Sequence, residues 1–300
     1  MKRTLKAFSR RAAAAAAALC MISGQAFAIP APVAGRPVDG AIDLQAAATP
    51  AAQNIHDFNN FILFIIIGIS VLVLALLVWV IVRYNRRANP TPKSFTHNVL
   101  VEVVWTVVPV LILVLIAARS FPILYEQERT PPTELTIKAI GNSWFWQYEY
   151  PELGVQVASN MLPADDPQLS AERPYLLAVD SPIYVPIDTN VRIQVTSNDV
   201  IHSWTVPSFG VKQDAIPGRI NQGWFRVTRE GTYFGQCSEL CGVNHAFMPI
   251  EVRAVSRAEF DRWVVSQGGS LAQADAPAVA PPAAPPAEAA PAAGVEQPAR

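Results

Sequence analysis

Residues 237–248, Cys-Ser-Glu-Leu-Cys-Gly-Val-Asn-His-Ala-Phe-Met, concentrate side chains that bind soft metal ions. Cys237 and Cys241 are four residues apart. His245 follows after four more residues, and Met248 lies three residues beyond it. After residue 118 the chain has one other histidine, His202, in the segment Asp-Val-Ile-His-Ser-Trp. Thiolate, imidazole and thioether groups in one short segment indicate copper chemistry.

Three kinds of chemistry fit the two cysteines. A disulfide is the default in an oxidising compartment, but it would close a short loop and leave His245 and Met248 without a role. Zinc accepts two cysteines and two histidines, although this spacing is not that of a zinc finger and methionine is not a usual zinc ligand. Two bridging thiolates can instead hold two copper ions, each completed by one histidine, with Met248 and the backbone carbonyl of Glu239 in the weak axial positions. The residues favour dinuclear copper and leave the disulfide and the zinc site open.

The composition limits the class of protein. Of 300 residues, 51% are hydrophobic and 16% are charged, against roughly 25% charged in an average soluble domain. The net charge of −1 gives no sign of the basic face that nucleic-acid binding needs, so we expect no nucleic-acid partner. The net charge hides an uneven distribution: the part after residue 118 carries 13 Lys and Arg against 20 Asp and Glu and is acidic. Such an acidic part suits the steering of a basic partner protein.

Residues 1–28 predict a secretory signal peptide. Five basic residues precede a short apolar run, and Ala26-Phe27-Ala28 forms an A-x-A cleavage site. The run is too short to span a bilayer, and cleavage after Ala28 would remove Cys20. A twin-arginine signal and a lipoprotein signal fit these residues less well. We expect residues 29–57 to form a periplasmic N-terminal segment.

Two apolar segments predict transmembrane helices at residues 58–82 and 99–119. Phe61–Val82 contains no charged residue and is long enough to cross ~30 Å of hydrocarbon. The loop 83–98 carries four Lys and Arg and no acid, so the positive-inside rule places it in the cytoplasm and both chain termini in the periplasm. Glu102 lies inside the second span, where an ionisable group either faces a polar pathway or reaches water near the membrane surface. The residues alone leave both interpretations open.

Residues 130–268 predict an all-β domain. Short segments with alternating apolar and β-branched residues are typical of an antiparallel sandwich. These segments are 134–140, 144–148, 183–186, 191–196, 202–206, 224–227, 231–234 and 250–253. A closing helix is expected after Ser256, because Ser256 and Glu259 form a capping box. Residues 269–300 are rich in Ala and Pro, a composition that cannot build a core, and we expect a disordered tail.

The segment 144–150 packs five aromatic residues into seven positions. Alternate positions are expected in the sandwich core, and the others would form an exposed aromatic patch, which favours binding. Three acids lie near the β segments: Glu149, Asp180 and Asp199. Each acid by itself is typical of a solvated surface charge.

Together these segments resemble subunit II of haem–copper cytochrome c oxidase, in its bacterial form with a cleaved signal peptide. The resemblance covers residues 36–266. In the membrane part it rests on Arg-Tyr-Asn-Arg-Arg at 83–87, His97-Asn98 with Glu102 and Trp105, and Thr-Val-Val-Pro-Val at 106–110. In the β domain it rests on the aromatic block at 144–150, Asp-Ala-Ile-Pro-Gly-Arg at 214–219 and Phe-Gly-Gln-Cys-Ser-Glu-Leu-Cys-Gly at 234–242. It implies a periplasmic cupredoxin-like sandwich with a dinuclear CuA centre. The implied ligands of its two copper ions are His202, Cys237, Glu239 through its carbonyl oxygen, Cys241, His245 and Met248.

The resemblance also implies roles for residues outside the copper site. Trp144 would receive electrons from a separate cytochrome c. That cytochrome c would dock on an acidic surface that contains Glu149, Asp180 and Asp199. The side chain of Glu239 would reach a magnesium ion at the interface with subunit I, and Glu102 would lie at the mouth of a proton channel of that subunit. Oxygen reduction and proton pumping would belong to subunit I, in a bacterial inner membrane.

Two departures and three alternatives complete the interpretation. Asn142 and Ser143 stand where the family usually has His-Gln, which changes hydrogen bonds next to Trp144 and not the copper ligands. No Cys-x-x-Cys-His motif for haem is present, so we expect the electron donor to be another protein. The main alternative is the copper-free structural subunit II of a quinol oxidase, which lacks the Cys and His ligands found here. A soluble enzyme with the same copper centre and a copper-delivery protein are disfavoured by the two spans.

Overall fold

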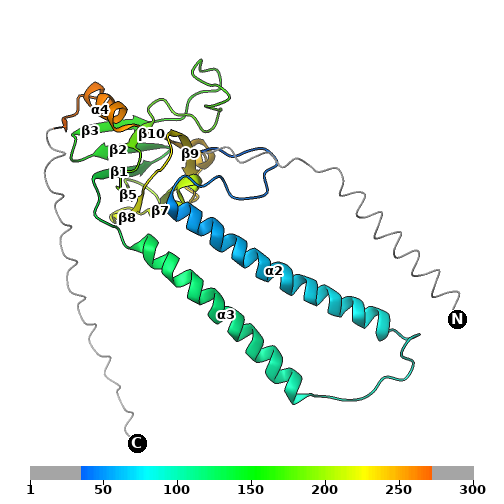
Figure 1. Cartoon of the computed structure of the whole chain (residues 1–300). Coiled ribbons are helices and arrows are strands. Elements are labelled where there is room, and N and C mark those ends of the chain that lie inside the picture. The colour runs from blue at the N-terminus through cyan, green and yellow to red at the C-terminus, as the bar shows by residue number, and fades with distance from the viewer. Residues whose placement is uncertain (1–34, 272–300) are drawn as a thin grey trace, which may run out of the picture.

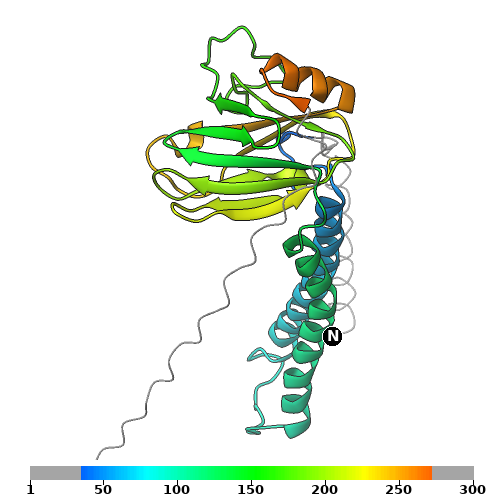
Figure 2. The same ribbon diagram turned by 90° about the vertical axis from the view of Figure 1, so that its left-hand side faces the viewer.

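The computed structural model describes residues 35–271. A β-sandwich sits at one end of two long helices that run side by side (Figure 1). Seen from the side, the sandwich projects away from the helix pair (Figure 2). The expected signal peptide and the tail beyond residue 271 lie outside the described residues.

The two helices are α2 (Pro50–Arg83) and α3 (Val99–Glu128). Thr49 begins α2 by accepting the Ala52 N–H at 3.0 Å, and Asn98 caps α3 in the same way. Each helix is long and apolar enough to cross a membrane, and no residue of either apolar window is buried. This much outward apolar surface requires lipid or neighbouring membrane helices to cover it. Both helices run past the predicted spans at the ends that meet the sandwich.

Within residues 35–271, ten strands form two five-stranded sheets. The first sheet contains, in spatial order, β3 (Val155–Ser159), β2 (Phe145–Tyr150), β1 (Leu135–Asn142), β5 (Val191–Ser197) and β8 (Asn221–Phe225). The second contains β4 (Ile183–Pro186), β10 (Pro249–Val255), β9 (Gly231–Cys237), β6 (His202–Val206) and β7 (Val211–Ala215). The all-β sandwich predicted from the sequence is therefore confirmed.

The antiparallel pairing expected from the sequence holds for most neighbouring strands, but two pairs are parallel. Strands β1 and β5 pair in parallel, with Leu135 opposite Val191, and so do β10 and β4, with Val252 opposite Ile183. Alternating residues show which face of a strand is buried, but they do not show which strand lies beside it. Strands β3 and β7 are not among the segments named from the sequence, and in β7 polar residues occupy the three central positions.

The core lies between the two sheets. Trp146, Tyr148 and Tyr150 point into it from β2, as the alternation of the aromatic block predicts. The predicted closing helix is α4 (Arg257–Ser266), and the Ser256 hydroxyl accepts the Glu259 N–H at its start. Its buried Phe260 and Val264 belong to the same core.

A long connection, residues 160–182, crosses the second sheet and is fixed by a buried ion pair. Arg173 donates from Nε and Nη2 to the two carboxylate oxygens of Glu251, each at 2.9 Å. The Glu251 side chain is fully buried and also accepts the Val179 N–H at 3.0 Å. This two-pronged contact holds the connection in one place.

The helices are joined to the sandwich at several points. Ala48 is buried in the sandwich core and accepts the Thr228 N–H at 3.0 Å. On α3, the Glu126 carbonyl accepts the indole N–H of Trp224 at 3.2 Å. The helix pair thus holds the sandwich in a defined orientation.

Candidate metal centre

The metal-binding side chains gather at one end of the second sheet. His202 is the first residue of β6 and Cys237 is the last residue of the antiparallel strand β9. Antiparallel neighbours bring the start of one strand beside the end of the other. The loop 238–248 then returns to β10 and carries Cys241 and His245, which begins a short 3₁₀ helix.

Both sulfur atoms lie beside an imidazole. The Sγ atoms of Cys237 and Cys241 are 3.8 Å apart. Nδ1 of His202 is 3.9 Å from the Cys237 sulfur, and Nδ1 of His245 is 3.5 Å from the Cys241 sulfur. Each thiol therefore has an imidazole of its own.

Two weaker donors complete the group. The carbonyl oxygen of Glu239 is 3.3 Å from the Cys237 sulfur, and the Met248 thioether is 3.6 Å from the Cys241 sulfur. The six groups named from the sequence thus converge on one place. The exposed side chain of Glu239 takes no part in this cluster.

The donor set fits copper better than the two alternatives. Both cysteines are free, and their sulfur separation is far above the ~2.05 Å of a disulfide. His202, Cys237 and Cys241 are buried, and their ligand atoms lie within 4.8 Å of one another. Two thiols with a thioether form a soft donor set that suits copper more than zinc.

The two thiols titrate differently without a metal. Burial raises the pKa of Cys237, but contacts with His202 and with the backbone at Glu239 outweigh it and lower the pKa to about 7. Burial and the neighbouring Cys237 raise the pKa of Cys241 to about 12. The pair alone thus favours one thiolate at neutral pH, whereas a metal cation removes the proton from a thiol that it binds.

Asp199 orients His202. Its Oδ1 lies 2.8 Å from Nε2 of His202, which leaves Nδ1 directed at Cys237. Its Oδ2 accepts the backbone N–H of Ser143 at 2.7 Å. Burial acts against the charge of Asp199, but these hydrogen bonds dominate and hold its pKa well below the usual value. Burial lowers the pKa of His202, but its contacts with Cys237 and Asp199 outweigh burial and raise it.

Trp144 touches the ligand loop directly. Its indole N–H donates to the carbonyl of Cys241 at 3.1 Å, while the ring remains partly exposed. Gly242 lies under this ring with φ +116°, and an added Cβ would come within 3.1 Å of it. Gly141 makes room for His202, because an added Cβ would lie 2.6 Å from the imidazole Cδ2. Both glycines are therefore required by close approach.

Comparison with known proteins places the chain in a family. The profile of the cytochrome c oxidase subunit II periplasmic domain matches residues 135–255, and that of the subunit II transmembrane domain matches residues 37–123. Cytochrome c oxidase subunit 2 of Cereibacter sphaeroides is 44% identical over 253 residues, which cover 79% of this chain and 84% of the relative. The chain belongs to the cytochrome c oxidase subunit II family.

Other members of the family are similar to the same extent. A probable cytochrome c oxidase subunit 2 of Rickettsia felis is 45% identical over 234 residues, covering 78% of this chain and 74% of the relative. A crystal structure of the periplasmic domain of subunit II from Bradyrhizobium japonicum is 45% identical, with a TM-score of 0.43. It covers 47% of this chain and 97% of that domain. As a subunit II, the chain is part of a membrane-bound respiratory oxidoreductase, and the quinol oxidase alternative is not favoured.

The remaining residues named from the sequence lie away from the metal centre. Glu149 on β2 pairs with Lys138 on β1 at 3.1 Å. Asp180 accepts both the backbone and the side-chain N–H of Asn160, at 2.9 and 3.1 Å. Glu102 lies in the first turns of α3 and accepts the Asn98 N–H at 3.2 Å. Glu102 therefore lies at the end of α3 that is farther from the sandwich.

Sequence reasoning missed two features of the site. The first is the contact between Asp199 and His202, which the three-residue spacing could have suggested. The second is a set of exposed apolar side chains beside the ligands, which we call the apolar rim. Its members are Val200, Ile201, Leu240, Val243 and Phe247. At the two departures next to Trp144, Asn142 accepts a hydrogen bond from Asn198 at 3.0 Å and the Ser143 N–H donates to Asp199 at 2.7 Å.

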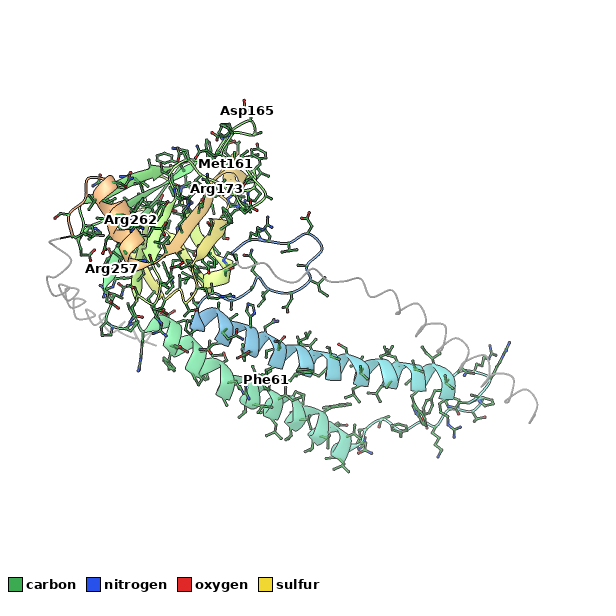
Figure 3. The ribbon with its side chains drawn as sticks, turned by 45° about the horizontal axis from the view of Figure 1, so that its top comes forward. Phe61, Met161, Asp165, Arg173, Arg257 and Arg262 are labelled. Atoms are coloured by element: carbon green, nitrogen blue, oxygen red, sulfur yellow. The ribbon has the colours of Figure 1, made fainter. Side chains whose placement is uncertain are left out.

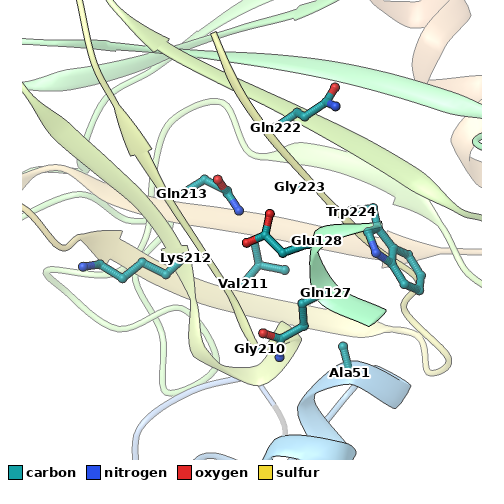
Figure 4. Close-up of a pocket in the computed structure, with 10 residues that line it drawn as sticks. All are labelled: Ala51, Gln127, Glu128, Gly210, Val211, Lys212, Gln213, Gln222, Gly223 and Trp224. Carbon is teal, nitrogen blue, oxygen red and sulfur yellow. The ribbon is translucent and has the colours of Figure 1, made fainter. Parts of the chain in front are cut away.

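A pocket of about 210 Å³ lies elsewhere, between the edge strands β7 and β8 and the ends of the helices (Figure 4). Glu128 and Lys212 line it together with Trp224. None of the six metal-ligand candidates lines this pocket. This pocket is therefore separate from the buried cluster.

Proposed function

We propose that the cluster holds two copper ions as a CuA centre and that this chain is the electron-transfer subunit of the oxidase. The proposed ligands are His202, Cys237, the Glu239 carbonyl, Cys241, His245 and Met248. The observation that carries the proposal is the pair of free, buried thiols 3.8 Å apart, each with its own imidazole. The bound copper pair would accept one electron at a time from cytochrome c and deliver it to the haem of subunit I.

The number of copper ions follows from the arrangement of the donors. A mononuclear blue-copper site needs one thiolate, two imidazoles and a thioether, and it would leave a second buried thiol without a role. Here each thiol has a separate imidazole and a separate weak donor, Glu239 O or Met248. This duplication supports two ions that share the two sulfurs.

We propose that Trp144 is where electrons reach the chain. Its partly exposed ring is one hydrogen bond away from the backbone of the ligand Cys241. Glu149 and Asp180 would provide the acidic docking surface for cytochrome c, with long-range steering from the acidic C-terminal part. Asp199 would contribute to docking as well, although both of its oxygens are already hydrogen-bonded.

Two further roles involve subunit I. The exposed Glu239 side chain, next to the apolar rim, could bind magnesium at that interface, since carboxylate oxygens suit this ion. Glu102, near one end of α3, would lie at the mouth of a proton channel of subunit I. This chain would then supply electrons, while subunit I reduces oxygen and pumps protons.

A copper count tests the proposed centre. The full-length chain in detergent should bind two copper ions and give the electron paramagnetic resonance spectrum of an electron shared by two coppers. One copper per chain, or a disulfide between Cys237 and Cys241 in the reduced preparation, would contradict the dinuclear site.

Rapid kinetics with reduced cytochrome c test Trp144. In the intact oxidase, Trp144→Phe should slow electron transfer to this chain and leave the copper count unchanged. Trp224→Phe is a matched control, since the Trp224 indole N–H also donates to a backbone carbonyl but at the helix end of the sandwich. Equal rates in wild type and Trp144→Phe would remove Trp144 from the electron path.

Turnover of the oxidase tests Glu102. Glu102→Gln should slow oxygen consumption without changing the affinity for cytochrome c. Glu128→Gln, at the opposite end of the same helix, serves as the control. Unchanged turnover in Glu102→Gln would leave Glu102 as a residue that only caps α3.

We also propose that both chain termini are periplasmic and that the loop 83–98 is cytoplasmic. The four bases of this loop support the orientation. A cysteine introduced at Lys93 should resist a membrane-impermeant thiol reagent in intact cells and react after lysis. Reaction in intact cells would reverse the orientation.

A further inference from the structure

A groove lies between the two transmembrane helices near the sandwich. It encloses about 540 Å³ between α2 and α3 and is separate from the metal centre. Its lining residues are Asn54, Asp57, Phe58, Leu115, Ala118, Arg119, Pro122 and Ile123. Apolar side chains form most of this lining, and one acid and one base lie among them.

The groove lies at the depth of the lipid headgroups. Asn54–Phe58 precede the first residue of the charge-free run, Phe61, by roughly 5–10 Å along the helix at 1.5 Å per residue. Arg119–Ile123 follow the last apolar residue of the other span by roughly 2–8 Å. The headgroup layer extends roughly 5–8 Å beyond the hydrocarbon on each side. Both walls of the groove therefore cross this layer, whichever side of the membrane the sandwich occupies.

The two charges in the groove have no ionic partner within the described residues. The guanidinium of Arg119 lies 5.0 Å from the centre of the Phe61 ring, and Figure 3 shows Phe61 between the two helices. This cation–π contact orients Arg119 without neutralising it. Asp57 accepts one hydrogen bond, from Gln53 one turn earlier on the same helix. A cation and an anion thus line one groove and remain available to a ligand.

We propose that this groove binds a phospholipid whose headgroup carries both a phosphate and an amine, as phosphatidylethanolamine does. Arg119 would bind the phosphate and Asp57 the ammonium group. An acyl chain would lie against Phe58 and Leu115. The charge pattern selects this occupant, because an anionic lipid would leave Asp57 without a cation and a helix of another subunit would cover two charges with apolar surface.

Photocrosslinking in the complete oxidase tests the proposal. A phosphatidylethanolamine with a photoreactive acyl chain is added to the oxidase in membrane vesicles, and labelled peptides are mapped. A diacylglycerol with the same photoreactive chain is the matched probe without a headgroup. We expect the first probe to label residues 54–58 and 115–123 and the second probe to label them about tenfold less, as expected from loss of the charged hydrogen bonds.

Variants then separate the two charges. Arg119→Gln should lower labelling by phosphatidylethanolamine about tenfold. Asp57→Asn should abolish the preference for phosphatidylethanolamine over phosphatidylglycerol. Arg129→Gln should change nothing, since Arg129 also follows the second span and lies over an aromatic ring, that of Tyr125, but does not line the groove.

Three outcomes would overturn the proposal. The first is equal labelling of the groove by the two probes, and the second is equal labelling of wild type and Arg119→Gln. The third is a chemical crosslink from Arg119 or Asp57 to another subunit of the oxidase, which would show that a protein helix fills the groove. None of these outcomes depends on the copper content of the chain.

Discussion

Replacing Asp199 by asparagine separates the two roles proposed for this residue, positioning of the ligand candidate His202 and docking of cytochrome c. The side chain keeps its size, but a neutral amide replaces the carboxylate whose oxygens face Nε2 of His202 at 2.8 Å and the Ser143 N–H at 2.7 Å. Loss of a carboxylate that orients a metal-bound histidine typically costs 10–100-fold in metal affinity. This corresponds to about 1.4–2.8 kcal/mol. We expect a loss in this range, because Asp199 contacts one of the two imidazoles.

The matched control for this variant is Asp180→Asn. Asp180 carries the same charge and accepts two hydrogen bonds from Asn160, but it contacts no ligand candidate. Copper affinity is measured by competition with a chromophoric Cu(I) chelator. The full-length chain is used because Ala48, which precedes the helices, is part of the sandwich core and would be lost if the helices were removed. Association with cytochrome c is measured in parallel at low salt. Both variants should slow association, and only Asp199→Asn should weaken copper binding. Copper affinity within twofold of wild type, or an equal loss in Asp180→Asn, would refute the positioning role.

Three further predictions follow from the same structure. Gly141→Ala should weaken copper binding and alter the copper spectrum, since its Cβ would lie 2.6 Å from the His202 ring; an unchanged spectrum would contradict this close approach. Arg173→Met should lower the free energy of unfolding in urea by roughly 1–3 kcal/mol, because the fully buried Glu251 carboxylate loses its two-pronged partner and keeps only Arg253 at 3.3 Å and the Val179 N–H at 3.0 Å; a loss below about 0.5 kcal/mol would show that the pair is not buried in solution. In the copper-free chain, thiolate absorbance in the ultraviolet should rise for one sulfur through pH about 7, because the pKa of Cys237 is lowered, and Cys237→Ser should abolish that step.

The sequence determined much of this protein by itself. A charge-free run as long as Phe61–Val82 has few alternatives to a membrane span. The segment 237–248 indicates copper chemistry through residue types and spacing, because few metals accept thiolate, imidazole and thioether together. The capping box at Ser256 was also readable, since its hydrogen bonds are local. In each case the deciding interaction lies within one short segment or between that segment and lipid.

Only the tertiary structure decided the features that depend on distant residues. The parallel pairing of β1 with β5 joins strands separated by three others in the chain, and alternation within a strand carries no information on such partners. Asp199 looked like a surface acid until folding placed Ser143 on one of its oxygens and His202 on the other. The meeting of His202 with Cys237 likewise needs β6 and β9 side by side. Local sequence specifies which groups are present, whereas the packing of the two sheets and two helices specifies which of them are close enough to act together.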